Sequence, residues 1–169
     1  MKSKPWPPRF CAACGARLRS FGQAGHARWR CARCGFIVYG NPVLAVVAVM
    51  TRGDRILLTR RAHPPFAGTW DLPGGFVEAD EEAADAVDRE LREELGVGVR
   101  RARLLTMVTD RYGRGGFPVA TAVYRVTPTP GPITPAADVS EARWFARGAI
   151  PYREIAFPSM RRALRAFFR

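Results

Sequence analysis

Residues 75–97 have the sequence GFVEADEEAADAVDRELREELGV, and this stretch decides which fold and which chemistry the chain supports. Its small and apolar residues recur at helical spacing, which predicts a helix over residues 81–95 with one buried face. The predicted buried residues are Ala83, Ala86, Val87, Leu91 and Leu95. On the same helix, Glu90, Glu93 and Glu94 follow the spacing i, i+3, i+4, so three carboxylates crowd one face.

Crowded carboxylates of this kind destabilise a helix unless a positive charge lies among them. Arg89 is one candidate for that charge. A divalent cation such as Mg²⁺ or Mn²⁺ is the other, because hard ions prefer oxygen ligands. The turn Leu72–Gly75 precedes the helix and can bring a backbone carbonyl, that of Gly75, beside the carboxylates. The alternative is an ordinary solvated acidic helix with ion pairs such as Arg89–Glu93.

Residues 75–97 also match the pattern Gly-x5-Glu-x7-Arg-Glu-hydrophobic-x-Glu-Glu-x-Gly-hydrophobic at every fixed position. The matching residues are Gly75, Glu81, Arg89, Glu90, Leu91, Glu93, Glu94, Gly96 and Val97. The segment therefore resembles the Nudix box, and the preceding WDLPGG of residues 70–75 is similar to that family as well. Asp80 departs from the glycine that the family commonly has there, and we expect it to cap the helix N-terminus instead.

The resemblance implies an α/β fold of the Nudix type, an α/β/α sandwich with a mixed sheet. It also implies that the chain is an enzyme, a pyrophosphatase in which water attacks a diphosphate with the help of bound metal. In this family pattern the three glutamates of the helix hold the metal, and Arg89 pairs with Glu81. Glu90 is our first choice for the base that takes a proton from water, and Glu141 is the second candidate.

The four cysteines form two CxxC pairs, Cys11 with Cys14 and Cys31 with Cys34, separated by sixteen residues. This spacing predicts a tetrahedral zinc site in which no position remains open for chemistry, and therefore a structural site. A glycine follows each pair directly, which lets the backbone turn tightly and direct its amides at the thiolates. The alternatives are two unrelated thiol pairs or a redox CxxC.

The net charge of +12 is unevenly distributed, because residues 1–53 contain nine Lys or Arg and no Asp or Glu. Such asymmetry favours polyanionic partners, either nucleic acid or phosphorylated small molecules. A solvated arginine-rich surface is the alternative.

The chain is long enough for one ordinary domain and a small extra module. We predict a zinc ribbon over residues 9–40 and a Nudix domain over residues 41–169. Hydrophobic patterning predicts five strands, at residues 43–50, 55–60, 104–109, 119–126 and 142–145. A last helix is predicted at 160–168. Tail and loop segments are predicted at residues 1–8, 62–75, 112–118 and 127–137.

Proteins that combine a zinc ribbon with a Nudix box include NADH pyrophosphatases and a shorter group that hydrolyses FAD and ADP-ribose. The chain lacks the Ser-Gln-Pro-Trp-Pro-Phe-Pro stretch of the first group. It is similar to the second group at YGNP (residues 39–42) and IAFPS (residues 155–159). We therefore expect nucleoside diphosphate-linked small molecules of the ADP-ribose or FAD type as substrates.

Two alternatives stay open. One is an NADH or RNA 5′-cap pyrophosphatase whose basic zinc ribbon binds nucleic acid. The other is a non-catalytic Nudix scaffold that senses a ligand. Four residues near a glycine-rich loop are candidates for lining the substrate site, with a solvated hairpin tip as the alternative; these are Arg111, Tyr112, Arg114 and Phe117.

The longest apolar stretch, Val43–Met50, is far too short to span a bilayer, which needs about 20 residues. We recognise no targeting segment, and the cysteine pattern does not call for an oxidising compartment. The chain is therefore expected to be cytoplasmic and to have no membrane partner, and a homodimer is left open.

Overall fold

The structure is a computed structural model that describes residues 8–23, 25–113 and 116–168. The chain divides into two compact units, each described here by itself: Met1–Val43 with Arg111–Pro118, and Leu44–Asp110 with Val119–Arg169. Residues 1–7 of the predicted tail and Arg114 of the predicted loop lie outside the described residues.

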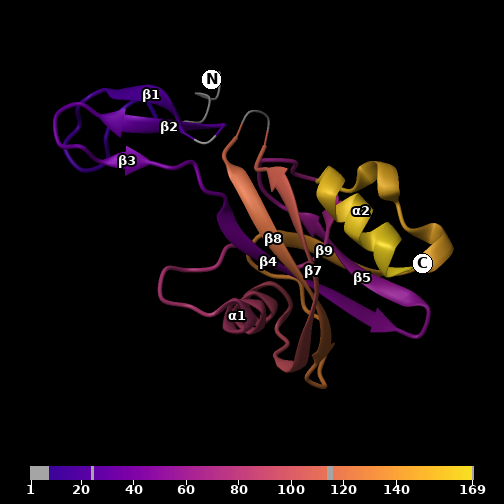
Figure 1. Ribbon diagram of the computed structural model, residues 1–169. Coiled ribbons are helices and arrows are strands. Elements are labelled where there is room, and N and C mark those ends of the chain that lie inside the picture. The colour runs from indigo at the N-terminus through magenta and orange to yellow at the C-terminus, as the bar shows by residue number, and fades with distance from the viewer. Residues whose placement is uncertain (1–7, 24, 114–115, 169) are drawn as a thin grey trace. The chain divides into compact units, whose positions relative to one another are not determined.

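The N-terminal unit contains a three-stranded antiparallel sheet (Figure 1). Its strands are β1 (Leu18–Gln23), β2 (His26–Cys31) and β3 (Ile37–Val38). The sequence predicted a cysteine module here but no strands, because these segments are short and rich in arginine rather than in alternating apolar residues.

The second unit is built on a six-stranded sheet of order β6-β5-β4-β8-β7, with β9 paired to β5. The strands are β4 (Val43–Arg52), β5 (Arg55–Arg61), β6 (Trp70–Asp71), β7 (Val99–Arg111), β8 (Pro118–Pro128) and β9 (Val139–Ala146). All five strands predicted from hydrophobic patterning are present. The short β6 lies within the segment that was predicted to be a loop.

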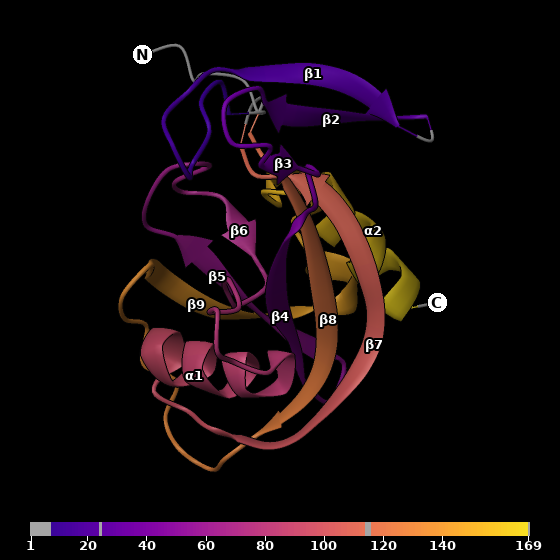
Figure 2. The ribbon, with the colours of Figure 1, turned by 60° about the vertical axis from the view of Figure 1, so that its left-hand side comes forward.

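Helices cover both faces of this sheet (Figure 2), and the side chains of β4 show why. Val46, Ala48 and Met50 pack with helix α1 (Ala83–Leu95), whereas Val47 and Val49 point the opposite way and pack with α2 (Pro158–Phe167). Because side chains alternate along a strand, an uninterrupted apolar strand requires cover on both sides. The predicted α/β/α sandwich is therefore confirmed. Two 3₁₀ turns, Arg147–Ala149 and Tyr152–Glu154, connect β9 to α2.

The segment that leads into α1 runs between β5 and β4. Trp70 and Asp71 pair with β5. The carbonyl of Pro73 then accepts a 2.9 Å hydrogen bond from the amide of Ala48, and the carbonyl of Gly75 accepts a bond of the same length from Val46. The chain is thus fixed to the central strand just before the helix begins.

Helix α1 begins later than expected. Its N-cap is Glu82, which makes no side-chain capping bond, so the prediction that Asp80 caps the helix is wrong. Residues 78–81 form a separate turn instead, in which the amide of Glu81 bonds to the carbonyl of Glu78 at 3.3 Å and its carboxylate accepts a bond from the Glu78 amide. The helix ends at Gly96, whose φ of 69° is left-handed and whose amide bonds to the carbonyl of Arg92.

We predict that Gly74→Ala destabilises the fold by about 2–4 kcal/mol. Gly74 has a φ of +139°, and a Cβ added there would lie 2.2 Å from the carbonyl oxygen of Val46. The matched control is Gly148→Ala, where an added Cβ meets nothing within 4 Å. The measurement is urea unfolding of both variants, and equal stability of the two would contradict the close packing described here.

Candidate functional site

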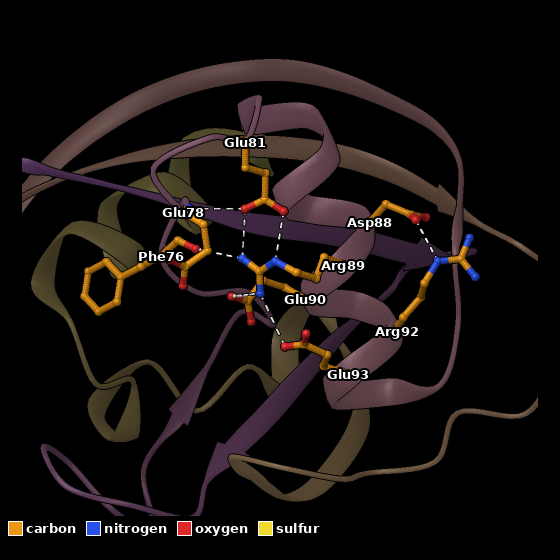
Figure 3. A network of polar contacts seen from close by, with 8 residues as sticks. All are labelled: Phe76, Glu78, Glu81, Asp88, Arg89, Glu90, Arg92 and Glu93. Atoms are coloured by element: carbon orange, nitrogen blue, oxygen red, sulfur yellow. Dashed lines mark hydrogen bonds and ion pairs between the residues drawn. The ribbon is translucent and has the colours of Figure 1, made fainter.

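The guanidinium of Arg89 is the centre of the polar network on α1 (Figure 3). Its Nε and Nη2 donate to the two carboxylate oxygens of Glu81, at 2.8 and 3.0 Å. Nη2 also donates to the carbonyl of Phe76 at 2.9 Å. Nη1 donates to Glu90 at 2.9 Å and to Glu93 at 3.3 Å. One side chain thus joins the loop before the helix to two of its three crowded glutamates.

This network changes the acidity of its members. The hydrogen bond from Arg89 lowers the pKa of Glu81, while burial works in the opposite direction. For Glu90, burial raises the pKa and Arg89 lowers it, with a net upward shift. The predicted pair Arg89–Glu81 is therefore present, and it is a two-oxygen contact of the kind that fixes geometry as well as charge.

Glu94 lies apart from Arg89 and is buried. The amide of Gly74 donates to its carboxylate at 2.9 Å. Burial, opposed by the hydrogen bond from the Gly74 amide and aided by the negative charges of Glu90, Asp71 and Asp138, raises the pKa of Glu94 to about 8 in total. The carboxyl is therefore surrounded by more negative charge than the protein neutralises.

Two of these neighbouring acids, Asp71 and Asp138, were not predicted as site residues. Asp71 is buried, and this burial raises its pKa to about 7 despite Arg61, whose Nη1 lies 3.8 Å from the carboxylate. Its position in the WDLPGG stretch was the available signal. Asp138 lies in an irregular segment and carried no signal, because its proximity to Glu94 depends on tertiary structure.

A metal ion fits this donor set by its chemistry. Glu90 and Glu93 each use one carboxylate oxygen for Arg89, and Glu94 uses one for Gly74, in the bonds that the described residues form. Gly75 lies directly against Glu90, since a Cβ added to it would be 2.3 Å from a carboxylate oxygen of that residue. Glu94 is buried, Glu90 is half-buried and Glu93 is exposed, and neighbouring carboxylates such as these are the ligands that a hard divalent ion prefers.

The three glutamates do not, however, converge on one point. Within the described ranges, the four cysteines are the one group of three or more potential ligands whose atoms lie within 4.8 Å of one another. The guanidinium of Arg89 lies between Glu90 and Glu93 and already supplies a positive charge. Arg89 is therefore the compensating charge that the structure shows for Glu90 and Glu93.

Glu141, the second candidate for the base, lies on the other face of the sheet. In β9 its neighbours Ala142 and Trp144 pack on the α1 side, and Phe145 packs on the α2 side. Alternation therefore places Glu141 on the α2 side. Arg60 holds its carboxylate at 3.0 Å, and Arg143 forms a second ion pair with it. The structure does not bring Glu141 together with the helix glutamates.

The loop after β7 is closed by its own contacts. The rings of Tyr112 and Phe117 stack with centroids 5.5 Å apart, and Arg111 donates to the carbonyl of Gly116 at 3.0 Å. These contacts give the three side chains a local structural role.

The cysteine module has the geometry of a four-thiolate site. The Sγ atoms of Cys11 and Cys34 are 3.6 Å apart, and those of Cys14 and Cys31 are 3.5 Å apart. All four are free thiols, and sulfurs at the corners of a tetrahedron about 2.3 Å from zinc lie about 3.8 Å from one another. The spacing therefore matches zinc and far exceeds a disulfide bond of about 2.05 Å.

The two halves of this site are built alike. The amide of Gly15 bonds to the carbonyl of Cys11 at 2.9 Å, and that of Gly35 to Cys31 at 3.0 Å. Both glycines have a left-handed φ, of 73° and 76°, which explains why glycine follows each pair. Hydrogen bonds from the Cys34 and Arg33 amides, opposed by burial, lower the pKa of Cys31 to about 6. Against the hydrogen bond from the Phe36 amide, the neighbouring thiols and burial raise the pKa of Cys34 to about 12. Cys31 is therefore the sulfur that favours the thiolate, the form that binds metal, in this group of four.

The chain belongs to the Nudix family: the NUDIX domain matches residues 41–167. The sheet, its two covering helices and the acidic face of α1 all lie within that range.

Two groups of relatives are prominent. The chain is 32% identical over 149 residues to the NAD-capped RNA hydrolase NudC of Pseudomonas aeruginosa, with 85% of this chain and 49% of that protein covered. It is 34% identical over 116 residues to the ADP-ribose pyrophosphatase of Methanocaldococcus jannaschii, with 68% of each covered. The chain thus spans about half the length of the NudC relatives that it matches.

Solved structures agree with the fold. A NUDIX hydrolase from Nitrosomonas europaea superposes with a TM-score of 0.72 at 25% identity, covering 95% of this chain and 90% of that one. The NUDIX domain of Shewanella oneidensis NrtR, solved with ADP ribose, superposes with a TM-score of 0.63 at 25% identity, covering 76% of this chain and 88% of that one.

In the part of the chain that the structure describes, no helix is both long and apolar enough to cross a membrane.

We predict that the protein purified without chelator contains about one zinc per chain. Cys11→Ser and Cys34→Ser should lower zinc content and the thermal stability of the ribbon, because metal binding is coupled to local folding. Hydrolytic activity per folded molecule should change less. Metal analysis by mass spectrometry is the measurement, and zinc-free protein with an intact fold would overturn the assignment.

Proposed function

We propose that the chain hydrolyses the diphosphate bond of nucleoside diphosphate-linked compounds in a metal-dependent reaction. The observation that carries the proposal is the α1 site itself, where Arg89 fixes Glu81, Glu90 and the Phe76 carbonyl while Glu94 remains buried and uncompensated. Membership of the Nudix family and the names of its relatives support it.

In this proposal the side chains have defined tasks, and Glu90 has two. Glu90, Glu93, Glu94 and the Gly75 carbonyl would hold Mg²⁺ or Mn²⁺, which would activate water and screen the oxygens of the substrate and leaving group. Arg89 and Glu81 position the loop against the helix. Glu90 takes the proton from water. It is the better candidate because Glu141 is held by two arginines on the opposite face of the sheet.

ADP-ribose and FAD remain the substrates we propose. The similarity to a protein named ADP-ribose pyrophosphatase, and to a Nudix domain solved with ADP ribose, supports this class. Both ligands carry a diphosphate between two bulky groups, so hydrolysis would give AMP and a second monophosphate.

NADH or NAD-capped RNA is the second candidate class. The observation in its favour is the similarity to relatives named NAD-capped RNA hydrolase, one of which, from Deinococcus radiodurans, covers 92% of this chain at 32% identity. The missing Ser-Gln-Pro-Trp-Pro-Phe-Pro stretch counts against it. A ligand-sensing scaffold without catalysis is the third candidate, and the complete glutamate set counts against that.

A structural zinc ion in the ribbon and a cytoplasmic setting also belong to this proposal, and a homodimer is left open. For the dimer, the candidate surface is β7, which ends the sheet in the described strand order. Leu104, Leu105 and Met107 of this strand are exposed. Exposed apolar side chains on an edge strand are a common basis for pairing between chains.

The first test concerns the glutamates. Glu93→Gln and Glu94→Gln should each lower turnover with Mg²⁺ by two or more orders of magnitude, because the lost charge weakens the ion that stabilises the transition state. In chelator, neither variant should unfold. Glu94→Gln should be at least as stable as the parent above pH 8, where the folded parent must bury a charge that the amide lacks. Near-normal turnover in both variants would refute the assigned site.

The second test concerns substrate choice. With Mg²⁺, a chromatographic panel should show faster hydrolysis of ADP-ribose or FAD than of NADH or nucleoside triphosphates. The expectation follows from the stretches 39–42 and 155–159 and from the relative of the ADP-ribose class. A clear preference for a triphosphate, or for NADH over both ADP-ribose and FAD, would show that the substrate assignment is wrong.

A further inference from the structure

The three-stranded sheet of the ribbon has two chemically different faces. Cross-strand partners lie on the same face of a sheet. The register pairs Arg19 with Arg30, and Phe21 with Arg28. Arg30 in turn is paired with Ile37 on β3. We call this the arginine face. The opposite face carries Leu18, Trp29 and Val38 instead.

Tyr39, just beyond β3, extends the arginine face. Arg28 donates through Nη1 to the carbonyl of Tyr39 at 2.8 Å, and its guanidinium lies 5.5 Å from the centroid of the Tyr39 ring. The ring is nevertheless 49% exposed. The arginine therefore holds the tyrosine in place while leaving it accessible for stacking by an aromatic ligand.

The positive charge of this face has no counterpart within the ribbon. Residues 1–53 contain no Asp or Glu, so no ion pair can form between side chains of this part of the chain. Arg19 and Arg30 are exposed and lie opposite each other on neighbouring strands. Like charges opposite each other are destabilising, and a polyanion would relieve that repulsion.

We propose that the arginine face of the ribbon binds single-stranded nucleic acid. The arginines provide contacts to consecutive phosphates, and the exposed Tyr39 ring, with Phe21 beside Arg28, provides a surface on which unpaired bases stack. A single strand fits better than a duplex, because the bases of a duplex are already stacked on one another. The proposal uses none of the residues of the α1 site and does not depend on the proposed hydrolysis.

The test measures binding of the full chain, loaded with zinc, to a fluorescent single-stranded RNA of about 12 nucleotides by anisotropy. A 5′-hydroxyl end gives the probe no diphosphate to cleave. Tyr39→Leu should weaken binding about five- to thirtyfold, and Tyr39→Phe should restore it because the ring is retained. Replacing both Arg19 and Arg30 with Gln should weaken binding and reduce the salt slope of log K by about 1.4.

The matched control for charge is the double replacement of Arg100 and Arg101 with Gln, two exposed arginines on β7. It should leave binding nearly unchanged. The remaining arms of the test use single-stranded DNA of the same sequence, the corresponding duplex, and polyphosphate. Single-stranded RNA and single-stranded DNA should both bind more tightly than the duplex or polyphosphate. The ribbon variants should hydrolyse ADP-ribose as fast as the parent. The binding test itself does not require hydrolysis, so its outcome is independent of whether the chain hydrolyses ADP-ribose.

Three results would overturn the proposal. The first is that Tyr39→Leu binds the RNA as tightly as the parent. The second is that the Arg100 and Arg101 double variant loses as much affinity as the Arg19 and Arg30 double variant. The third is that duplex or polyphosphate binds as tightly as the single strands. Zinc content and circular dichroism of each variant establish that the ribbon is folded when binding is lost.

Discussion

The contact between Arg89 and Glu81 is the interaction on which the functional part of the structure depends. It spans the loop and the helix, and the same guanidinium also holds the Phe76 carbonyl and Glu90. A two-oxygen arginine–carboxylate contact restricts orientation as well as distance. Because Arg89 is bonded from several directions, the loop before α1 has little freedom to move relative to the glutamates, which is what a preorganised catalytic site requires.

The same loop is constrained on its other side by β4. The carbonyls of Pro73 and Gly75 accept bonds from the central strand, and Gly74 passes so close to Val46 that no side chain fits. The amide of Gly74 then reaches the buried carboxylate of Glu94. The glycines of this stretch are therefore required by close packing against the sheet and the helix, and the backbone itself becomes part of the site.

The sequence predicted those features that depend on local spacing. The helix, its crowded glutamates, the apolar strand at 43–50 and the paired cysteine turns follow from periodicity and from motifs. It did not predict features set by long-range packing. The proximity of Asp71 and Asp138 to Glu94, and the opposite face occupied by Glu141, depend on how strands pair. The Asp80 cap was wrong because residues 78–81 close a turn of their own and the helix begins only after Glu82.

The charge distribution of each unit determines how that unit interacts with anions. No binding site common to the two units is assigned. Near Glu94 the protein concentrates Glu90, Asp71 and Asp138, which repel one another and would repel a diphosphate. Arg89 is one positive charge shared among three glutamates, so in the proposed function a bound cation would be what lets a phosphate approach this region. The chain as a whole nevertheless carries a charge of +12, with an N-terminal region free of acids. Its long-range field therefore attracts anions, and in the function proposed above the metal would serve substrate binding as well as chemistry.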